Sequence, residues 1–173
     1  YLVKKEGVPE LEKEIANLKD EFLSYAVGLV VAGYSAEDVR DMLESSVETT
    51  YERMVVPVKI LKYMGSAAPA FGMIGTLVGL IVMLNNIGGS PEQLGGGLAT
   101  ALLTTLYGAF VANVLFAPIV GKLEYYTSYE VVYREIVLEG LRGIARSESP
   151  RNIQDQMAAA LPPKLQSKFE LAA

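Results

Sequence analysis

Three threonines in otherwise uncharged stretches are the side chains of this sequence best suited to chemistry. Thr76 stands alone, and Thr104 and Thr105 are adjacent, each within a long apolar run. Hydroxyl oxygens are ligands that hard cations such as Na⁺ accept, so the three threonines could line a hydrated ion path. The alternative is that each hydroxyl bonds the backbone carbonyl four residues earlier in its own helix. The residue types alone leave both interpretations open.

Other kinds of chemistry lack their usual residues. The chain has no histidine and no cysteine, which excludes the commonest general base, the commonest metal ligand and any thiolate site. Gly72, Gly75 and Gly79 do not form a dinucleotide-binding fingerprint. We therefore expect no enzyme activity, no metal centre and no cofactor. An ion path normally also needs an ionisable carrier, which another subunit would have to supply.

The elements that position the threonines are two apolar runs, Tyr63–Leu84 and Leu94–Gly121. Between Tyr63 and Gly121 the only charged side chain is Glu92. About 20 apolar residues suffice for a helix to cross a bilayer, so each run is long enough. The sequence predicts an all-α integral membrane protein built on a helical hairpin. Its expected parts are a first polar arm (1–62), a membrane helix (63–84), a loop (85–93), a second membrane helix (94–121) and a second polar arm with a tail (122–173).

The flanking charges predict the orientation of the hairpin. Arg53, Lys59 and Lys62 precede the first run and Lys122 follows the second, whereas the 85–93 loop has no Lys or Arg. Positive residues stay on the cytoplasmic side, so both arms should be cytoplasmic and the loop outside. The net charge of −5 offers no basic stripe for phosphates and argues against a nucleic-acid partner.

The polar arms are expected to be helical. Residues 9–18 form a short amphipathic helix, and residues 22–34 are apolar but too short to span, which predicts a buried helix that Gly33 ends. Ser35 begins a capping-box pattern for a helix over 36 to about 54, which Pro57 should interrupt. A helix over 122–145 should break at 149–151, before a last short helix at 152–160. The chain begins at Tyr1 rather than Met, so we expect a fragment of a longer protein.

Small residues recur at helical spacing in both apolar runs. Membrane helices associate through close packing and polar contacts, which such stripes permit. The stripes are too extensive for two helices alone and predict further partners. Their members are Gly72, Gly75 and Gly79 in the first run and Gly97, Ala101, Thr105, Gly108 and Ala112 in the second. Pro69 and Pro118 can each kink a helix and offer hinge positions.

Three blocks together resemble the MotA/PomA family, the A subunit of the bacterial flagellar stator. They are APAFGMIGTLVGLIVML, GLATALLTTLYGAFVANVLFAPIVGKL and EGLRGIARSESPRNIQ, in the family's order and spacing over nearly the whole chain. The resemblance implies a four-helix subunit of the inner membrane, in which the hairpin is the third and fourth helix. It implies a homopentamer around a MotB/PomB-type B subunit that brings a membrane aspartate.

The resemblance also assigns roles to particular residues. It places Thr76, Thr104 and Thr105 on the ion path and Pro69 and Pro118 in the conformational change that accompanies ion flow. The threonine pair is closer to the sodium-driven PomA/MotP branch, so the transported cation is expected to be Na⁺ rather than H⁺.

Contact with the rotor switch protein FliG is the third role that the resemblance implies. A basic and an acidic residue eight apart should make it, and Lys4 and Glu12 fit, with neighbours that could share the role. These neighbours are Lys5, Glu10, Lys13 and Glu14. The alternatives are a solvated helix face for this cluster and, for the whole protein, an ExbB/TolQ-type energiser of outer-membrane transport.

Overall fold

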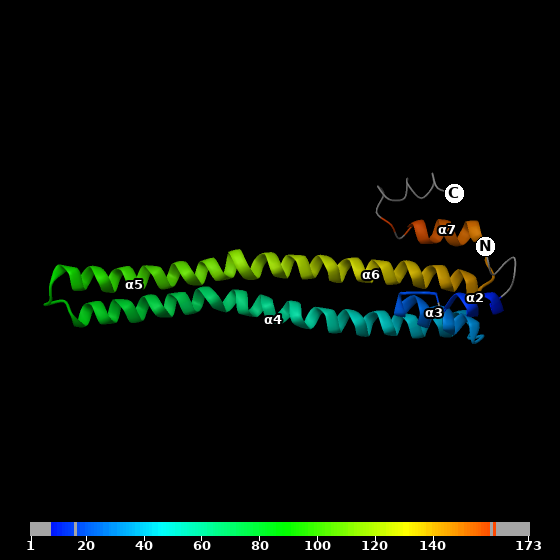
Figure 1. The fold of residues 1–173 in the computed structure, drawn as a ribbon, viewed down its shortest axis with the longest axis horizontal. Helices are drawn as coiled ribbons and strands as arrows, with labels where there is room; N and C mark the ends of the chain where they lie inside the picture. Colours follow the sequence, from blue (N-terminus) through cyan, green and yellow to red (C-terminus); the bar gives the residue numbers. More distant parts are fainter. Residues whose placement is uncertain (1–7, 16, 160, 162–173) are drawn as a thin grey trace. The chain divides into compact units, whose positions relative to one another are not determined.

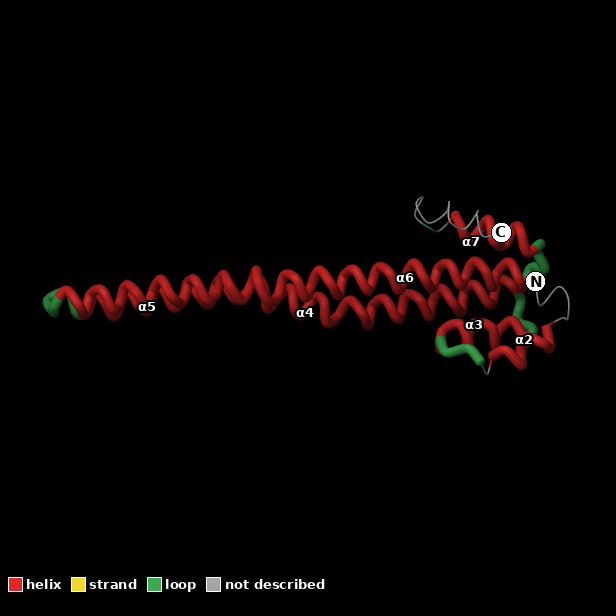
Figure 2. The backbone as a smooth tube through the Cα atoms, turned by 45° about the horizontal axis from the view of Figure 1, so that its top comes forward, coloured by secondary structure: helices red, strands yellow, loops and turns green. Residues whose placement is uncertain are grey.

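The computed structural model describes residues 8–15, 17–159 and 161, with only the backbone of residues 8–10, 14 and 91–93. Every regular element in these ranges is a helix, and no strand occurs among them (Figure 2). The chain forms two compact units. One is the segment Arg53–Tyr126, called the helical hairpin below; the other combines Tyr1–Glu52 with Thr127–Ala173 and is called the polar unit.

The polar unit has an apolar core made by three helices. Helix α3 (Glu21–Val31) contributes half of its buried residues, and α4 (Ala36–Asn85) and α6 (Ala117–Ala145) contribute the other half from their ends within this unit. Helix α2 (Val8–Ile15) packs Leu11 and Ile15 against the same core. The buried residues are Phe22, Ala26, Val27, Leu29, Val30, Val39, Leu43, Val137, Leu138 and Leu141. The apolar stretch near residues 22–34 is therefore a buried helix, as predicted.

Local signals in the sequence set the ends of α3 and the start of α4. Asp20 Oδ1 accepts a hydrogen bond of 2.7 Å from the Leu23 amide, which caps α3. Gly33 follows α3 with a φ of 82°, a left-handed conformation that glycine adopts without strain. Ser35 Oγ accepts a 3.1 Å bond from the Asp38 amide and caps α4. The predicted capping signal is confirmed.

The interruption predicted at Pro57 is wrong. Helix α4 continues for 50 residues, from Ala36 to Asn85, and contains both Pro57 and Pro69. A proline removes one backbone hydrogen bond and crowds the carbonyl four residues before it. The bonds on either side of each proline hold the helix together, and both rings lie on exposed positions. A proline within a long helix therefore does not by itself mark a boundary.

The second half of the hairpin is one continuous helix with three parts. Helix α5 (Pro91–Phe110) leads into a π-helical segment, η1 (Val111–Phe116), and then into α6. It runs antiparallel to α4 (Figure 1). Pro91 begins α5, so residues 91–93 are helical and the turn covers 86–90. Two helical segments, Ala36–Asn85 and Leu94–Ala145, are long and apolar enough to cross a membrane; the exact membrane boundaries stay a prediction.

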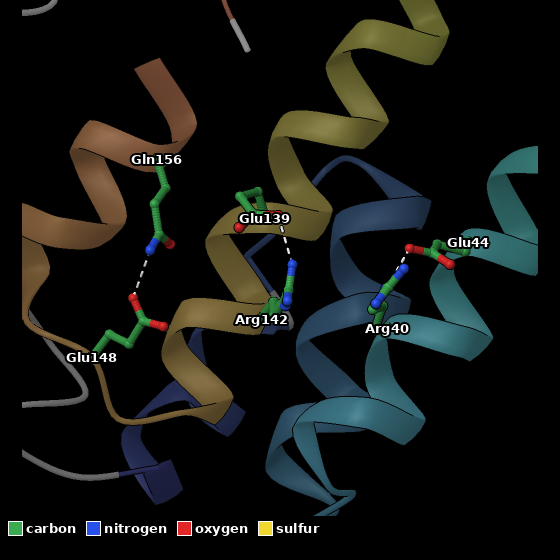
Figure 3. A network of polar contacts seen from close by, with 6 residues as sticks. All are labelled: Arg40, Glu44, Glu139, Arg142, Glu148 and Gln156. Carbon is green, nitrogen blue, oxygen red and sulfur yellow. Dashed lines mark hydrogen bonds and ion pairs between the residues drawn. The ribbon is translucent and has the colours of Figure 1, made fainter. Parts of the chain in front are cut away.

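Helix α7 (Pro150–Ala159) begins two residues before the predicted start, because Pro150 opens the helix rather than breaking it. A Cβ on Gly143 would lie 2.6 Å from Ile153 Cγ1, so this glycine allows α7 to pack closely on α6. Gln156 Nε2 donates to Glu148 at 2.9 Å, and Arg142 pairs with Glu139 on α6 (Figure 3). These contacts are polar and surround the end of the core.

Candidate functional site

Backbone-to-backbone packing brings the two helices of the hairpin together at Gly72 and Gly108. A Cβ on Gly108 would lie 2.7 Å from the carbonyl oxygen of Ala68, and one on Gly72 would lie 2.9 Å from the carbonyl oxygen of Thr104. Real side chains do not tolerate such distances. The glycines are therefore required for the approach of α4 and α5, as expected for helices that associate by packing rather than by hydrophobic burial.

Most of the small residues are used inside this hairpin. A Cβ on Gly75 would lie 2.7 Å from Thr104 Cβ, and one on Gly79 would lie 2.9 Å from Ala101 Cβ. Gly97 meets Met83 in the same way. The argument that two helices cannot use so many small residues is therefore wrong. The small residues of each stripe face the other helix of the hairpin along one antiparallel contact. The stripes therefore do not by themselves require partners.

The three threonines predicted to share a site lie together at this contact. Thr76 Oγ1 lies 3.0 Å from the Gly72 carbonyl oxygen and 3.1 Å from the Ala101 carbonyl oxygen. It also makes a hydrogen bond with Thr105 Oγ1 from the other helix. Thr104 Oγ1 donates to the Ala101 carbonyl at 2.8 Å and lies 3.4 Å from the Gly72 carbonyl. Three hydroxyls and two carbonyl oxygens thus converge on one point of the hairpin.

The interpretation that each hydroxyl stays on its own helix holds only in part, and the ion path stays a prediction. Thr76 does reach the carbonyl four residues earlier, yet the same oxygen bridges to Thr105 across the hairpin. A hydroxyl has one proton and two lone pairs, so Thr76 can donate to a carbonyl while accepting from Thr105. Thr105 is exposed, whereas Thr76 and Thr104 are half-buried, so the oxygen cluster opens to the outside of the hairpin at Thr105.

A feature that the sequence reasoning missed is the π-helical segment η1, which lies directly before Pro118. The Ala117 amide bonds the carbonyl of Ala112, five residues back. In an α-helix the Pro118 ring would crowd the carbonyl of Val114, and the wider π turn relieves that contact. Single π segments are frequent at functional sites. Pro118 was the available signal, but Pro57 and Pro69 show that proline alone does not predict a π segment.

The predicted rotor-contact charges fall mostly outside what the structure describes. Lys4 and Lys5 lie outside the described residues, and the side chains of Glu10 and Glu14 are not described. Glu12 and Lys13 are exposed on α2. Their role, and the pairing of Lys4 with Glu12, stay predictions. Pro69 and Pro118 are both exposed within the hairpin and do not contact the oxygen cluster in any described bond.

Comparison with known proteins places this hairpin in a family. The sequence profile of the MotA/TolQ/ExbB proton channel family matches residues 14–136, which include all three threonines. The chain belongs to this family. Motility protein A of Cereibacter sphaeroides is 44% identical over 171 residues, covering 99% of this chain and 66% of that protein. Chemotaxis protein PomA of Vibrio alginolyticus is 37% identical over 147 residues, covering 85% of this chain and 58% of that protein.

Solved structures show the same fold. The flagellar MotAB stator complex from Bacillus subtilis contains a chain with a TM-score of 0.87 and 32% identity, covering 97% of this chain and 66% of that one. The MotAB structure of C. jejuni gives the same TM-score of 0.87 at 26% identity. The predicted all-α fold with two long apolar helices is confirmed. This chain spans between 58% and 66% of the length of these relatives.

Proposed function

We propose that this chain comes from the A subunit of a flagellar motor stator. With a B subunit it would pass cations across the bacterial inner membrane and convert their passage into torque. The main supporting observation is the fold, since 97% of the chain matches a chain of a flagellar stator complex with a TM-score of 0.87. The helix contact in the hairpin also gathers hydroxyl and carbonyl oxygens. Such oxygens replace part of the water shell of a hard cation.

The site needs a negative charge that the hairpin does not contain. Between Tyr63 and Gly121 the only acid is Glu92, which lies sixteen positions after Thr76 and twelve before Thr104 in the sequence. A carboxylate from a MotB/PomB-type B subunit, placed against the exposed side of Thr105, would complete the cation route. The named structures of this fold are MotAB complexes, which supports a B subunit as the partner.

Sodium is the proposed cation. Five oxygens at one point suit a metal ion that needs several ligands, whereas a proton needs only one acceptor at a time. PomA and motility protein A are both among the relatives, so the names of the relatives do not decide between Na⁺ and H⁺. The oxygen count favours Na⁺.

The proposed oligomeric state, rotor contact and proline roles rest on the similarity to the stator proteins of the family. The A subunit is proposed to form a homopentamer around the B subunit, with both polar arms in the cytoplasm. The exposed charges Glu12 and Lys13 on α2, together with Lys4, Lys5, Glu10 and Glu14, would act on FliG through screened electrostatic attraction. Pro69 and Pro118 would absorb the helix bending that accompanies each ion.

An ExbB/TolQ-type energiser is the alternative within the same family. The two relatives reported above are named motility protein A and chemotaxis protein PomA, and neither name refers to outer-membrane transport. Expression of the full-length gene in a non-motile stator mutant separates the two. Restored swimming supports the stator, and restored outer-membrane uptake without swimming would contradict it.

Ion flux tests the site directly. The full-length protein with its B subunit is placed in vesicles, and Na⁺ uptake is compared for the parent and Thr76→Val, which keeps the shape and removes the hydroxyl. We expect uptake to fall roughly tenfold or more, since a lost charge-assisted contact costs about 1.5–3 kcal/mol. Thr76→Ser should restore most of it.

The matched control is Thr100→Val. Thr100 lies one turn from Thr104 on α5, and its hydroxyl only bonds its own helix at the Gly96 carbonyl, 3.0 Å away. Uptake within about twofold of the parent is expected there. Equal losses in Thr76→Val and Thr100→Val, with assembly intact, would show that the oxygen cluster is structural and is not the ion route.

A further inference from the structure

One end of the hairpin carries a positive charge that the rest of the chain does not share. The segment Arg53–Tyr126 holds four basic residues, and all four lie near the two open ends of the hairpin rather than near its turn. Within the segment Arg53–Tyr126, Glu124 is the only acid near the open ends, since Glu92 lies at the turn. The end therefore has a net charge of about +3 in a chain whose total is −5. The basic residues are Arg53, Lys59, Lys62 and Lys122.

The register of the helices brings two of these lysines to one depth. Gly65 faces Phe116, since a Cβ on Gly65 would lie 3.1 Å from Phe116 Cβ. Six residues further toward the open end on each helix lie Lys59 and Lys122. At a rise of about 1.5 Å per residue, both lie about 9 Å beyond that contact. Two cations from different helices thus meet at the same level.

Neither of these two lysines is neutralised by a carboxylate within the part of the chain that the structure describes. Lys62 instead pairs with Glu124 across the two helices. Lys122 Nζ lies 5.9 Å from the centre of the Tyr126 ring, a cation–π contact that leaves its charge in place. Lys59 and Lys122 are both exposed. Their charges are available to an anion from outside.

Three tyrosines stand near these lysines in the sequence, at the ends of the apolar runs: Tyr63, Tyr125 and Tyr126. Tyr63 is 75% exposed and Tyr125 is 66% exposed, and Tyr125 packs edge-on against Tyr126 with ring centres 5.9 Å apart. Between Tyr63 and Gly121 the hairpin carries no basic side chain. Tyrosine rings of this kind gather where hydrocarbon meets lipid headgroups, because the ring is apolar and the hydroxyl is polar.

We propose that this basic belt, defined as Lys59, Lys122, Tyr63, Tyr125 and Tyr126, binds the headgroups of anionic phospholipids on the cytoplasmic side of the membrane. The inference rests on the proposal that the hairpin crosses the membrane. Lys59 and Lys122 attract the headgroup phosphate from two helices, and the tyrosine hydroxyls donate hydrogen bonds to the same region. A soluble phosphate would use the lysines but would gain nothing from exposed rings beside an uncharged run.

Lipid retention by the purified complex tests the proposal. The full-length protein with its B subunit is equilibrated with equal amounts of phosphatidylcholine and phosphatidylglycerol, and native mass spectrometry measures the ratio of the two bound lipids. We expect the parent to favour phosphatidylglycerol roughly fivefold or more. Lys59→Gln with Lys122→Gln should bring the ratio to within about twofold of one, and Lys59→Arg with Lys122→Arg should keep the preference.

The matched control removes the same charge from the polar unit. Lys19→Gln with Arg151→Gln changes two exposed basic residues and should leave the lipid ratio unchanged. An equal loss in this control, or an even lipid ratio in the parent, would overturn the proposal. Displacement of the bound lipid by inorganic phosphate would show a soluble-anion site and would overturn it as well. Should the double glutamine variant not assemble, Lys122→Gln alone is measured and must lower the ratio.

The measurements of lipid binding and of ion flux can refute the two proposals independently of each other. A complex that selects anionic lipid and passes no cation would refute the stator function and leave the belt standing. A complex that passes Na⁺ with no lipid preference would refute the belt alone.

Discussion

Helices pack through large apolar side chains in the polar unit and through glycines in the hairpin. In the polar unit, Leu43 and Val39 are fully buried between helices, and the charges lie outside. In the hairpin, glycine backbones make the contact and the large side chains point away, with Phe71 71% exposed and Leu77 57% exposed. Water drives apolar side chains inward, whereas lipid does not, so membrane helices depend on close approach. Helix α4 takes part in both arrangements along its length.

The contrast between the two regions predicts its largest stability effect at the glycine contact of the hairpin. Gly108→Leu should destabilise the hairpin by about 3 kcal/mol, because the new side chain would meet the Ala68 carbonyl and the Gly72 backbone. Gly95→Leu, on the same helix with open space around it, should change stability by about 0.5 kcal/mol or less. Unfolding in detergent micelles measures both. Similar values for the two variants would mean that glycine packing does not hold the hairpin.

The converse test removes a large side chain from each region. Leu43→Ala should cost about 3 kcal/mol through the lost burial and the cavity left behind. Leu77→Ala, on the outward side of the hairpin, should cost about 1 kcal/mol or less in the same assay. The Leu77 side chain has lipid-like surroundings both in the folded hairpin and in the separated helices. A larger loss at Leu77 than at Leu43 would reverse the proposed contrast.

Helix caps offer a smaller test. Ser35 caps α4 through its hydroxyl, whereas Ser90 at the start of α5 makes no side-chain cap bond. Ser35→Ala is therefore expected to cost about 1 kcal/mol, and Ser90→Ala only a few tenths. Thermal unfolding of the two variants side by side gives the answer. Equal shifts would show that the hydroxyl of Ser35 contributes nothing beyond its backbone.

The smallest expected effect is a pH dependence confined to the polar unit. Burial raises the pKa of Tyr133 above its ordinary value of 10, and the nearby Asp20 carboxylate raises it further. The folded state therefore favours the neutral phenol. Its stabilisation is complete below pH 10 and is lost as pH rises through the folded pKa. As pH rises above 10, the free energy of unfolding should fall less steeply in Tyr133→Phe than in the parent, and identical slopes would contradict this.

Sequence reasoning succeeded where one local pattern had one physical cause. The apolar runs, the buried α3, the Gly33 end and the Ser35 cap each follow from neighbouring residues. It failed at Pro57, because a long helix can lose the one backbone hydrogen bond that a proline removes and still continue. No local signal in the sequence reveals that α4 is this long. It also missed η1, since a π turn depends on how the surrounding helix accommodates Pro118.

The three threonines show where the sequence by itself stops. The sequence alone determined that three hydroxyls lie at similar positions within two apolar runs that carry no charge beside them. Whether each hydroxyl stayed on its own helix or joined the others was decided by the antiparallel register, which Gly72 and Gly108 set by backbone contact. Register is a relation between residues more than twenty positions apart, so it arises only when both helices are packed.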